Sequence, residues 1–333
     1  MIANLQVLRA IAAMMVVYQH TYRLLTGHDA RGWEWGGAGV DIFFVISGFI
    51  MVYTTQGGRK PIDFWRNRLQ RIVPLYWLMT FAIFVVALVI PSVLGATRAS
   101  PTALLQSLLF IPYVKGNGAV APMLPMGWSL NLEMLFYALF GACLYFGKWS
   151  VAACALVLCM LVSLHPIATN PVWAFVTQPL MLGFVAGMLI AKFKPVIPVW
   201  AAIAILPFCF ASFLVHVMYF PTVDHGVARL LPSALIVLAF ISFEEHGMVV
   251  KSRLPLLLGN ASYSIYLVHP FITQPFVIFS HKGGGLGVVF WALAMSCSAL
   301  AGIALYLAVE APITDYLKRH RGTRRLGLSA VTS

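Results

Sequence analysis

The feature that most constrains this chain is the length and recurrence of its apolar runs. Ten stretches long enough for a helical crossing follow one another, at about 5–25, 37–56, 73–95, 127–147, 149–167, 172–191, 198–220, 227–243, 255–280 and 285–310. About 20 apolar residues suffice for one crossing. Only 10% of the 333 residues are charged, whereas soluble proteins carry about 25%. The sequence therefore predicts an all-α polytopic membrane protein with about ten transmembrane helices.

The basic residues indicate how these helices are oriented. With a cytoplasmic N-terminus, fifteen lysines and arginines fall on the inner side and six on the outer side, and Arg9 lies inside the first span. Because lysine and arginine are enriched on the cytoplasmic side, we expect both termini there. The net charge of +12 then follows from topology and attraction to anionic lipid, and it requires no nucleic-acid partner.

One domain is expected. The membrane domain covers residues 1–315, and residues 316–333 form a basic cytoplasmic tail that we predict to be disordered. The stretch "PTALLQSLLFIP" at 101–112 is too short to cross and is predicted to be re-entrant or interfacial. The five cysteines lie within spans without metal-like pairing, so we expect neither a disulfide framework nor a metal site.

Ionisable side chains inside the predicted spans are candidates for function, since they are costly in a membrane. They are Arg9, His20, Asp41, Glu133 and His269, with Glu310 at a span end. In the predicted orientation Arg9 lies towards the cytoplasm. The two histidines and the carboxylates of Asp41 and Glu133 share a depth below the outer surface.

The stretch "LRAIAAMMVVYQH" at 8–20 links two of these residues. Arg9 and His20 are eleven residues apart, which is about three helical turns and roughly 16 Å. They therefore lie on one face of one helix. This geometry suits a long anionic donor that enters from the cytoplasm and places its reactive end near His20.

A basic loop precedes the third predicted span. The stretch "RKPIDFWRNRLQRIVPLYW" contains Arg66, Arg68 and Arg71, followed by Tyr76 at the interface. One interpretation is ordinary anchoring by positive charge and an aromatic belt. The other is a phosphate-binding patch, because guanidinium groups suit phosphate oxygens.

Five stretches, in order along the chain, resemble the acyltransferase family 3 integral-membrane transferases, most closely those that O-acetylate bacterial exopolysaccharides. They are Arg9-x10-His20, "GVDIFFVISGFIM" (39–51), "RNRLQRIVPLYW" (66–77), "GWSLNLEMLFY" (127–137) and "LGNASYSIYLVHP" (258–270). The resemblance implies ten membrane helices in the bacterial inner membrane, acetyl-CoA as a cytoplasmic donor substrate rather than a bound cofactor, and a sugar acceptor at the outer face. It also implies that Arg9 and His20 are the essential pair.

The same resemblance assigns supporting roles to other residues. It implies that the motif Phe43-Phe44-x-x-Ser47-Gly48 and Glu133 assist the pair. Some family members carry a C-terminal extracytoplasmic hydrolase-like domain, whereas this chain ends in "KRHRGTRRLGLSAVTS". We therefore expect transfer to be completed within the membrane domain, or the acyl group to be handed to a separate protein.

Our mechanistic hypothesis makes His20 the general base on a sugar hydroxyl, with an acyl-histidine intermediate as the alternative. Asp41 or Glu133 would orient the histidine, following triad logic. The predicted donor site comprises Arg66, Arg68, Arg71, Ser47, Gly48 and Tyr76, and the additional candidates are Ser129, Tyr263 and His269.

Structural roles compete with several of these assignments. Asp41 could cap its helix, Glu133 could pair with a basic residue, and His269 could cap a kink at Pro270. Ser47 and Gly48 could form a close contact between helices. Two other functions also remain open: a secondary transporter, and a non-catalytic component of a polysaccharide export assembly. The expected partners are acyl-CoA, a polysaccharide or lipid-linked sugar, membrane lipids and other polysaccharide biosynthesis proteins.

Overall fold

The computed structural model describes residues 2–26, 34–58, 60–280 and 287–317. Across these residues the chain is helical, and the only β-type pairing is one isolated bridge between Val114 and Val120. The all-α prediction is confirmed. Most of the predicted tail, residues 318–333, lies outside the described residues.

The helices follow one another with short connections. The first half comprises α1 (Ala3–Thr26), η1 (Glu34–Gly37), α2 (Ala38–Thr55), α3 (Pro61–Val89), η2 (Pro91–Leu94), α4 (Pro101–Leu108), α5 (Gly127–Cys143), η3 (Leu144–Trp149), α6 (Ser150–Ser163) and η4 (His165–Ile167). The second half comprises α7 (Pro171–Thr177), η5 (Pro179–Met181), α8 (Leu182–Phe193), α9 (Val199–Tyr219), α10 (His225–Ala228), α11 (Leu230–Glu245), α12 (Arg253–Asn260), α13 (Ser262–Ser280), α14 (Gly287–Leu305) and η6 (Tyr306–Glu310).

Seven helical segments of the described chain are long and apolar enough to cross a membrane. They are Glu34–Thr55, Pro61–Val89, Gly127–Ile167, Pro171–Phe193, Val199–Tyr219, His225–Glu245 and Gly287–Leu317. Together they contain eight of the ten predicted spans, because Gly127–Ile167 holds two of them. The protein is therefore multi-pass, while the count of about ten and the cytoplasmic termini stay predictions.

The two remaining predicted spans correspond to α1 and to α12–α13. At 24 residues, α1 is about 36 Å long and exceeds the hydrocarbon thickness of about 30 Å. It also carries Asn4, Gln6, Arg9 and Gln19 in buried positions, which lower its hydropathy. These four polar side chains point into the protein, where other helices surround them.

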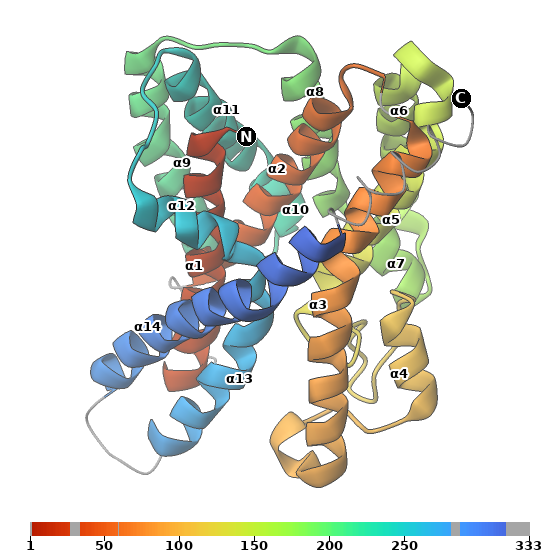
Figure 1. Cartoon of the computed structure of the whole chain (residues 1–333), viewed down its shortest axis with the longest axis vertical. Coiled ribbons are helices and arrows are strands. Elements are labelled where there is room, and N and C mark those ends of the chain that lie inside the picture. Colours follow the sequence, from red (N-terminus) through yellow and green to blue (C-terminus); the bar gives the residue numbers. More distant parts are fainter. Residues whose placement is uncertain (1, 27–33, 59, 281–286, 318–333) are drawn as a thin grey trace, which may run out of the picture.

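The helices form two groups joined by a central pair (Figure 1). Helices α1, α9, α11 and α12 lie on the left of the view and α3 to α7 on the right, with α2 and α8 between them. α2 is buried along most of its length and packs on α1, α8 and α11. α1 and α13 contact each other and run in the same direction (Figure 1).

Two glycines allow α2 and α8 to cross at close range. A Cβ atom placed on Gly48 would lie 2.1 Å from the Phe184 carbonyl oxygen, and one on Gly187 would lie 1.9 Å from the Val45 carbonyl oxygen. Small residues permit such backbone contact between membrane helices. The structure thus places Gly48 at a helix crossing, which is the packing role left open above.

The stretch at 101–112 forms only the eight-residue helix α4, too short to cross, as predicted. Its C-terminal carbonyls are held by α3: Tyr76 donates its hydroxyl hydrogen to the Ser107 oxygen (3.1 Å), and the Trp77 indole N–H donates to the Leu108 oxygen (2.9 Å). Tyr76 also stacks on Phe110 at 4.5 Å between ring centroids. Tyr76 therefore fixes α4 against α3.

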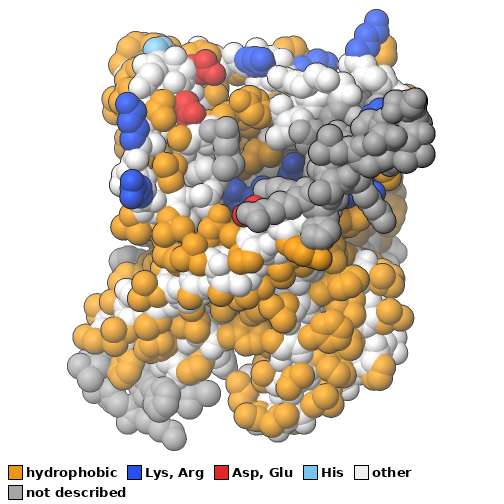
Figure 2. Space-filling view, viewed as in Figure 1, with side chains coloured by type: hydrophobic (Ala, Val, Ile, Leu, Met, Phe, Trp, Pro, Cys, Tyr) orange, Lys and Arg blue, Asp and Glu red, His pale blue; other side chains and the backbone are white. Residues whose placement is uncertain are grey.

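On one face of the molecule, charged and hydrophobic side chains separate along the direction of the helices (Figure 2). Figure 2 shows lysine and arginine side chains in the upper part of this face, where α1 begins, and mainly hydrophobic side chains in the lower half. Lysine and arginine favour the cytoplasmic side of a membrane, so this distribution supports the predicted orientation.

Candidate functional site

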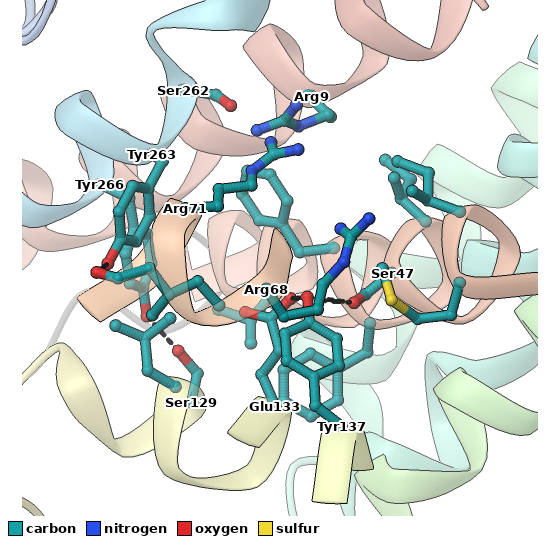
Figure 3. Close-up of a pocket in the computed structure, with 18 residues that line it drawn as sticks. Arg9, Ser47, Arg68, Arg71, Ser129, Glu133, Tyr137, Ser262, Tyr263 and Tyr266 are labelled. Carbon is teal, nitrogen blue, oxygen red and sulfur yellow. Dashed lines mark hydrogen bonds between the residues drawn. The ribbon is translucent and has the colours of Figure 1, made fainter. Parts of the chain in front are cut away.

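A pocket opens where α1, α2, α3, α5 and α13 meet (Figure 3). Its empty space, including the solvent at its mouth, is about 750 Å³. Its polar lining residues are Arg9, Ser47, Arg68, Arg71, Ser129, Glu133, Tyr137, Ser262, Tyr263 and Tyr266. Seven of the predicted site residues are in this set, although they come from five separate helices.

Three arginines give the pocket its charge. Arg68 and Arg71 are three residues apart on α3, so they lie on one face of that helix, and Arg9 reaches the pocket from α1. Arg9 is only 7% exposed and donates from Nη1 to the Gln6 Oε1 at 3.1 Å. The Arg68 guanidinium lies 5.9 Å from the centre of the Phe64 ring, and its Nε is buried without a hydrogen-bond partner among the described residues.

Glu133 is the carboxylate that lines this pocket. Its Oε1 accepts hydrogen bonds from the hydroxyls of Ser47, at 2.8 Å, and Tyr137. The Ser47 and Tyr137 hydroxyl oxygens are themselves 3.2 Å apart. Glu310 also lies within electrostatic range of Arg9 and Arg71. The three arginines still outnumber the two carboxylates, and this excess of positive charge favours an anionic ligand.

Two tyrosines of α13 close the side of the pocket that faces α3 and α5. Tyr263 donates its hydroxyl hydrogen to the Ile72 oxygen at 2.8 Å. Tyr266 donates to the Met126 oxygen at 3.0 Å, and its hydroxyl lies 2.7 Å from the Ser129 Oγ. These bonds tie α13 to both neighbouring helices and place two hydroxyls at the end of the pocket.

His20 lies beside the pocket, against His269. The two imidazole centroids are 5.1 Å apart, and Tyr266 lies 6.0 Å from His269. The His20 Nδ1 is 2.8 Å from the Val16 carbonyl oxygen. Because a carbonyl oxygen only accepts, Nδ1 carries the hydrogen and the neutral ring keeps its lone pair on Nε2.

His269 is fully buried, and neither of its ring nitrogens has a hydrogen-bond partner among the described residues. Arg9 and His20 both face α13, since Arg9 shares the pocket with Tyr263 and His20 contacts His269. The structure therefore places the cationic pocket and the histidine pair along one helix pair, connected through Tyr266.

Asp41 lies in a different environment. Its Oδ1 is 3.6 Å from the His225 Nδ1 and its Oδ2 is 3.8 Å from the Arg229 Nη1. The Arg229 Nε donates to the His216 Nδ1 at 3.4 Å. Asp41 thus faces α10 and α11, and it links the start of α2 to these helices.

Three other residues of the predicted donor site lie outside the pocket lining. Arg66 is exposed on α3, Gly48 packs on α8, and Tyr76 packs on α4. Among the described residues, no three His, Cys, Asp or Glu side chains are grouped closely enough to hold a metal ion.

Tyr137 and Tyr266 line the pocket but were not singled out in the sequence. A signal was available for Tyr137, because it follows Glu133 by four residues and so shares its helix face. Tyr266 is likewise three residues after Tyr263. Neither spacing stands out in a sequence rich in aromatic residues.

The fold and the pocket define a multi-pass α-helical membrane protein with a cationic site among its helices. Residues 2–308 match the family model described as an acyltransferase domain. The chain therefore belongs to the acyltransferase family 3, and the resemblance inferred from its motifs is confirmed.

Individual relatives support this assignment. The chain is 37% identical to the exopolysaccharide production protein ExoZ of Rhizobium meliloti (strain 1021), over 90% of this chain and 94% of that protein. It is 26% identical to the acyltransferase MdmB of Streptomyces mycarofaciens, over 86% and 83%. It is 24% identical to the O-acetyltransferase OatA of Staphylococcus aureus (strain NCTC 8325 / PS 47), over 92% of this chain but only 56% of that protein. No solved structure matches the chain.

Proposed function

We propose that this protein is a membrane O-acetyltransferase that moves an acetyl group from cytoplasmic acetyl-CoA to a hydroxyl of an exopolysaccharide sugar. Its acyltransferase family supports the reaction class. The relatives named for exopolysaccharide production and for O-acetyl transfer support the acceptor and the acyl group. The proposed location is the bacterial inner membrane, with the donor on the cytoplasmic side.

The observation that carries the proposal is the meeting of Arg9, Arg68 and Arg71 in one pocket. Coenzyme A carries a diphosphate and a 3′-phosphate, and guanidinium groups bind such oxygens strongly. Glu133 balances part of the arginine charge and, through Ser47 and Tyr137, fixes the pocket wall. The pantetheine arm is long enough to cover much of the roughly 16 Å between Arg9 and His20.

His20 acts on the acceptor in this proposal. Its Nε2 takes the proton of the sugar hydroxyl while the hydroxyl oxygen attacks the thioester carbonyl carbon. The tetrahedral intermediate collapses with cleavage of the C–S bond, and the coenzyme A thiolate leaves and receives the proton from His20 Nε2. In this proposal the Ser129 hydroxyl turns its hydrogen from the Tyr266 oxygen, 2.7 Å away, to the carbonyl oxygen as that oxygen gains charge.

Acetate transfer in membrane vesicles tests the role of His20. The assay follows label from acetyl-CoA into exopolysaccharide, at matched membrane abundance of each variant. We expect His20→Ala to lower kcat about 100-fold or more, the usual contribution of a general base. His246→Ala is the matched control, because the exposed His246 makes the same Nδ1 contact one turn back, to the Ser242 oxygen at 2.7 Å.

The same assay tests the donor site. Arg68→Ala and Arg71→Ala should each raise the KM for acetyl-CoA about tenfold, the effect of losing a hydrogen bond to a charged group. Arg66→Ala on the same helix should change the KM for acetyl-CoA little.

Full activity of His20→Ala would contradict the mechanism. Absence of transfer by the wild type, with the cell's polysaccharide still acetylated, would favour a non-catalytic component instead.

A further inference from the structure

One buried carboxylate lies beside the candidate site without lining it. Glu310 is the last residue of η6, a π-helical turn that continues α14, and it is only 8% exposed. η6 packs on α3, the helix that carries two of the pocket arginines (Figure 1). A π-helical turn is wider than an α-helical one and is often found at functional sites. This turn places a carboxylate next to the arginine pocket, although Glu310 is not part of the pocket lining.

The carboxylate of Glu310 is held by α13. The Ser264 hydroxyl donates to the Glu310 Oε2 at 2.6 Å, and Ser264 is fully buried. Ser264 directly follows Tyr263, which lines the pocket. Within the described residues, neither Arg9 nor Arg71 forms a direct ion pair with Glu310. The carboxylate is therefore fixed at Ser264 and acts on the arginines through space.

The charge of Glu310 acts on two arginines that repel each other. In Figure 3 the guanidinium groups of Arg9 and Arg71 point towards one another, and their like charges repel. Glu310 attracts both, and its attraction for Arg9 exceeds that of Glu133. Burial makes the charge of Glu310 costly, and the Ser264 hydroxyl and the two guanidinium groups offset part of this cost. Glu310 thus balances two of the guanidinium groups that would bind phosphate.

Charge balance matters at this site because substrate and product share the same phosphates. In the proposed function, acetyl-CoA and the product coenzyme A present identical diphosphate and 3′-phosphate groups to the arginines. Binding energy that is the same at every stage of the reaction lowers KM without raising kcat, and tighter binding mostly slows dissociation. A negative charge beside the arginines reduces this shared binding energy.

We propose that Glu310 sets the affinity of the arginine pocket for coenzyme A: its fixed negative charge opposes the phosphates, so that the product leaves after transfer. This inference rests on the proposed function and adds a residue that determines donor affinity. Ser264 keeps the carboxylate from pairing directly with Arg9 or Arg71, so the two guanidinium groups stay open to phosphate oxygens. In this role Glu310 touches neither the thioester nor the sugar.

Binding of coenzyme A to the full-length protein in nanodiscs tests the proposal without depending on catalysis. Glu310→Gln removes the charge but keeps an oxygen that accepts from Ser264. We expect its Kd for coenzyme A to fall about tenfold, the order of effect of one nearby charge inside a protein. Glu245→Gln, at an exposed position of α11, is the matched control and should keep the wild-type Kd. A structural defect would raise the Kd of Glu310→Gln instead of lowering it.

Ser264→Ala should change the Kd in the opposite direction. It releases the carboxylate to pair with Arg9 or Arg71, and such a pair competes with the phosphates, so we expect a Kd about tenfold higher. In the double variant with Glu310→Gln, the loss of Ser264 should have little effect, because the charge that Ser264 restrains is gone. A Kd of Glu310→Gln that is unchanged or raised would overturn the inference, and so would additive effects in the double variant.

Acetate transfer in vesicles adds a readout of product release. Added coenzyme A should inhibit Glu310→Gln at a concentration about tenfold lower than it inhibits the wild type. If the wild type transfers acetyl groups but Glu310→Gln shows unchanged binding and inhibition, the inference fails and the proposed function stands. If the wild type binds coenzyme A but transfers no acetyl group, the proposed function fails and the Kd values alone decide the inference. A wild type that does not bind coenzyme A overturns both.

Discussion

At the scale of single residues, the pocket depends on how Glu133 is held among arginines. Its carboxylate accepts from two hydroxyls, and one of these, on Tyr137, is fully enclosed by the helices around the pocket. A partly buried carboxylate that loses a donor keeps part of its desolvation cost without compensation. The two hydroxyls therefore satisfy the Glu133 oxygen that lies in the same pocket as Arg9 and Arg68.

Removing one hydroxyl tests this arrangement. Tyr137→Phe should lower the free energy of unfolding by about 1–2 kcal/mol, the cost of leaving a partly buried acceptor short of a donor. Thermal unfolding in detergent measures the change, with Tyr145→Phe as control because Tyr145 is 77% exposed. In combination with Ser47→Ala the effects should be non-additive. Simple additivity would show that the two hydroxyls act independently.

Lys115 provides a prediction of pH dependence outside the membrane-spanning segments. Its Nζ donates to the Thr97 Oγ1 at 2.8 Å, and burial lowers the pKa of Lys115 from 10.5 to about 8. Between pH 8 and 10.5 the unfolded chain therefore binds more protons than the folded one, so stability rises with pH across this window. Below about pH 8 both states are protonated and the slope disappears.

The Lys115→Met variant should lose this rise. Thermal unfolding of wild type and variant between pH 7 and 11 measures it, and Lys251→Met, at an exposed position, should keep the wild-type profile. An unchanged slope in Lys115→Met would mean that another group titrates in this window.

At the scale of helices, the crossing of α2 and α8 sets where the pocket residues of α2 point. Ser47 and Gly48 are neighbours in sequence, but each residue of a helix is turned by about 100° from the last. Ser47 therefore lines the pocket while Gly48 lies against the Phe184 backbone. The close approach of the two backbones fixes this rotation of α2.

Adding a methyl group at the crossing should force the helices apart. Gly187→Ala would place a carbon 1.9 Å from the Val45 oxygen, and we expect a loss of at least about 1–3 kcal/mol in stability, as for other overpacked sites. Gly48→Ala should behave similarly. Gly116→Ala, where nothing lies within 4 Å of the added carbon, is the control. Wild-type thermal stability of Gly187→Ala would contradict the close contact.

At the scale of the whole molecule, the distribution of positive charge predicts which side of the membrane each loop occupies. Asn117 lies in the connection between α4 and α5, and Lys251 in the connection between α11 and α12. An impermeant maleimide should label Asn117→Cys in intact spheroplasts and Lys251→Cys only after permeabilisation. The wild-type chain, with its own five cysteines, measures the background. The reverse pattern would invert the predicted topology.

Much of the site could be located in the sequence, residue by residue. Arg9, Arg68, Arg71 and Glu133 stand out because a charge inside or beside an apolar run is costly and must face other polar groups. All four line the pocket. The partners of these residues could not be predicted in the same way, since Tyr137 and Tyr266 are ordinary aromatic residues of helix faces until their hydroxyls meet Glu133 and Ser129.

Asp41 shows most clearly that contacts between helices could not be predicted from the sequence. Its depth in the second predicted span suggested proximity to His20, yet it faces Arg229, which lies 188 residues further along the chain. The sequence by itself determined the helical class, the apolar segments and the charged residues that must be enclosed, because each depends on local composition and on the cost of burying charge. Only the tertiary structure decided which of these residues meet, since the rotation and crossing of each helix are set by contacts with helices far away in sequence.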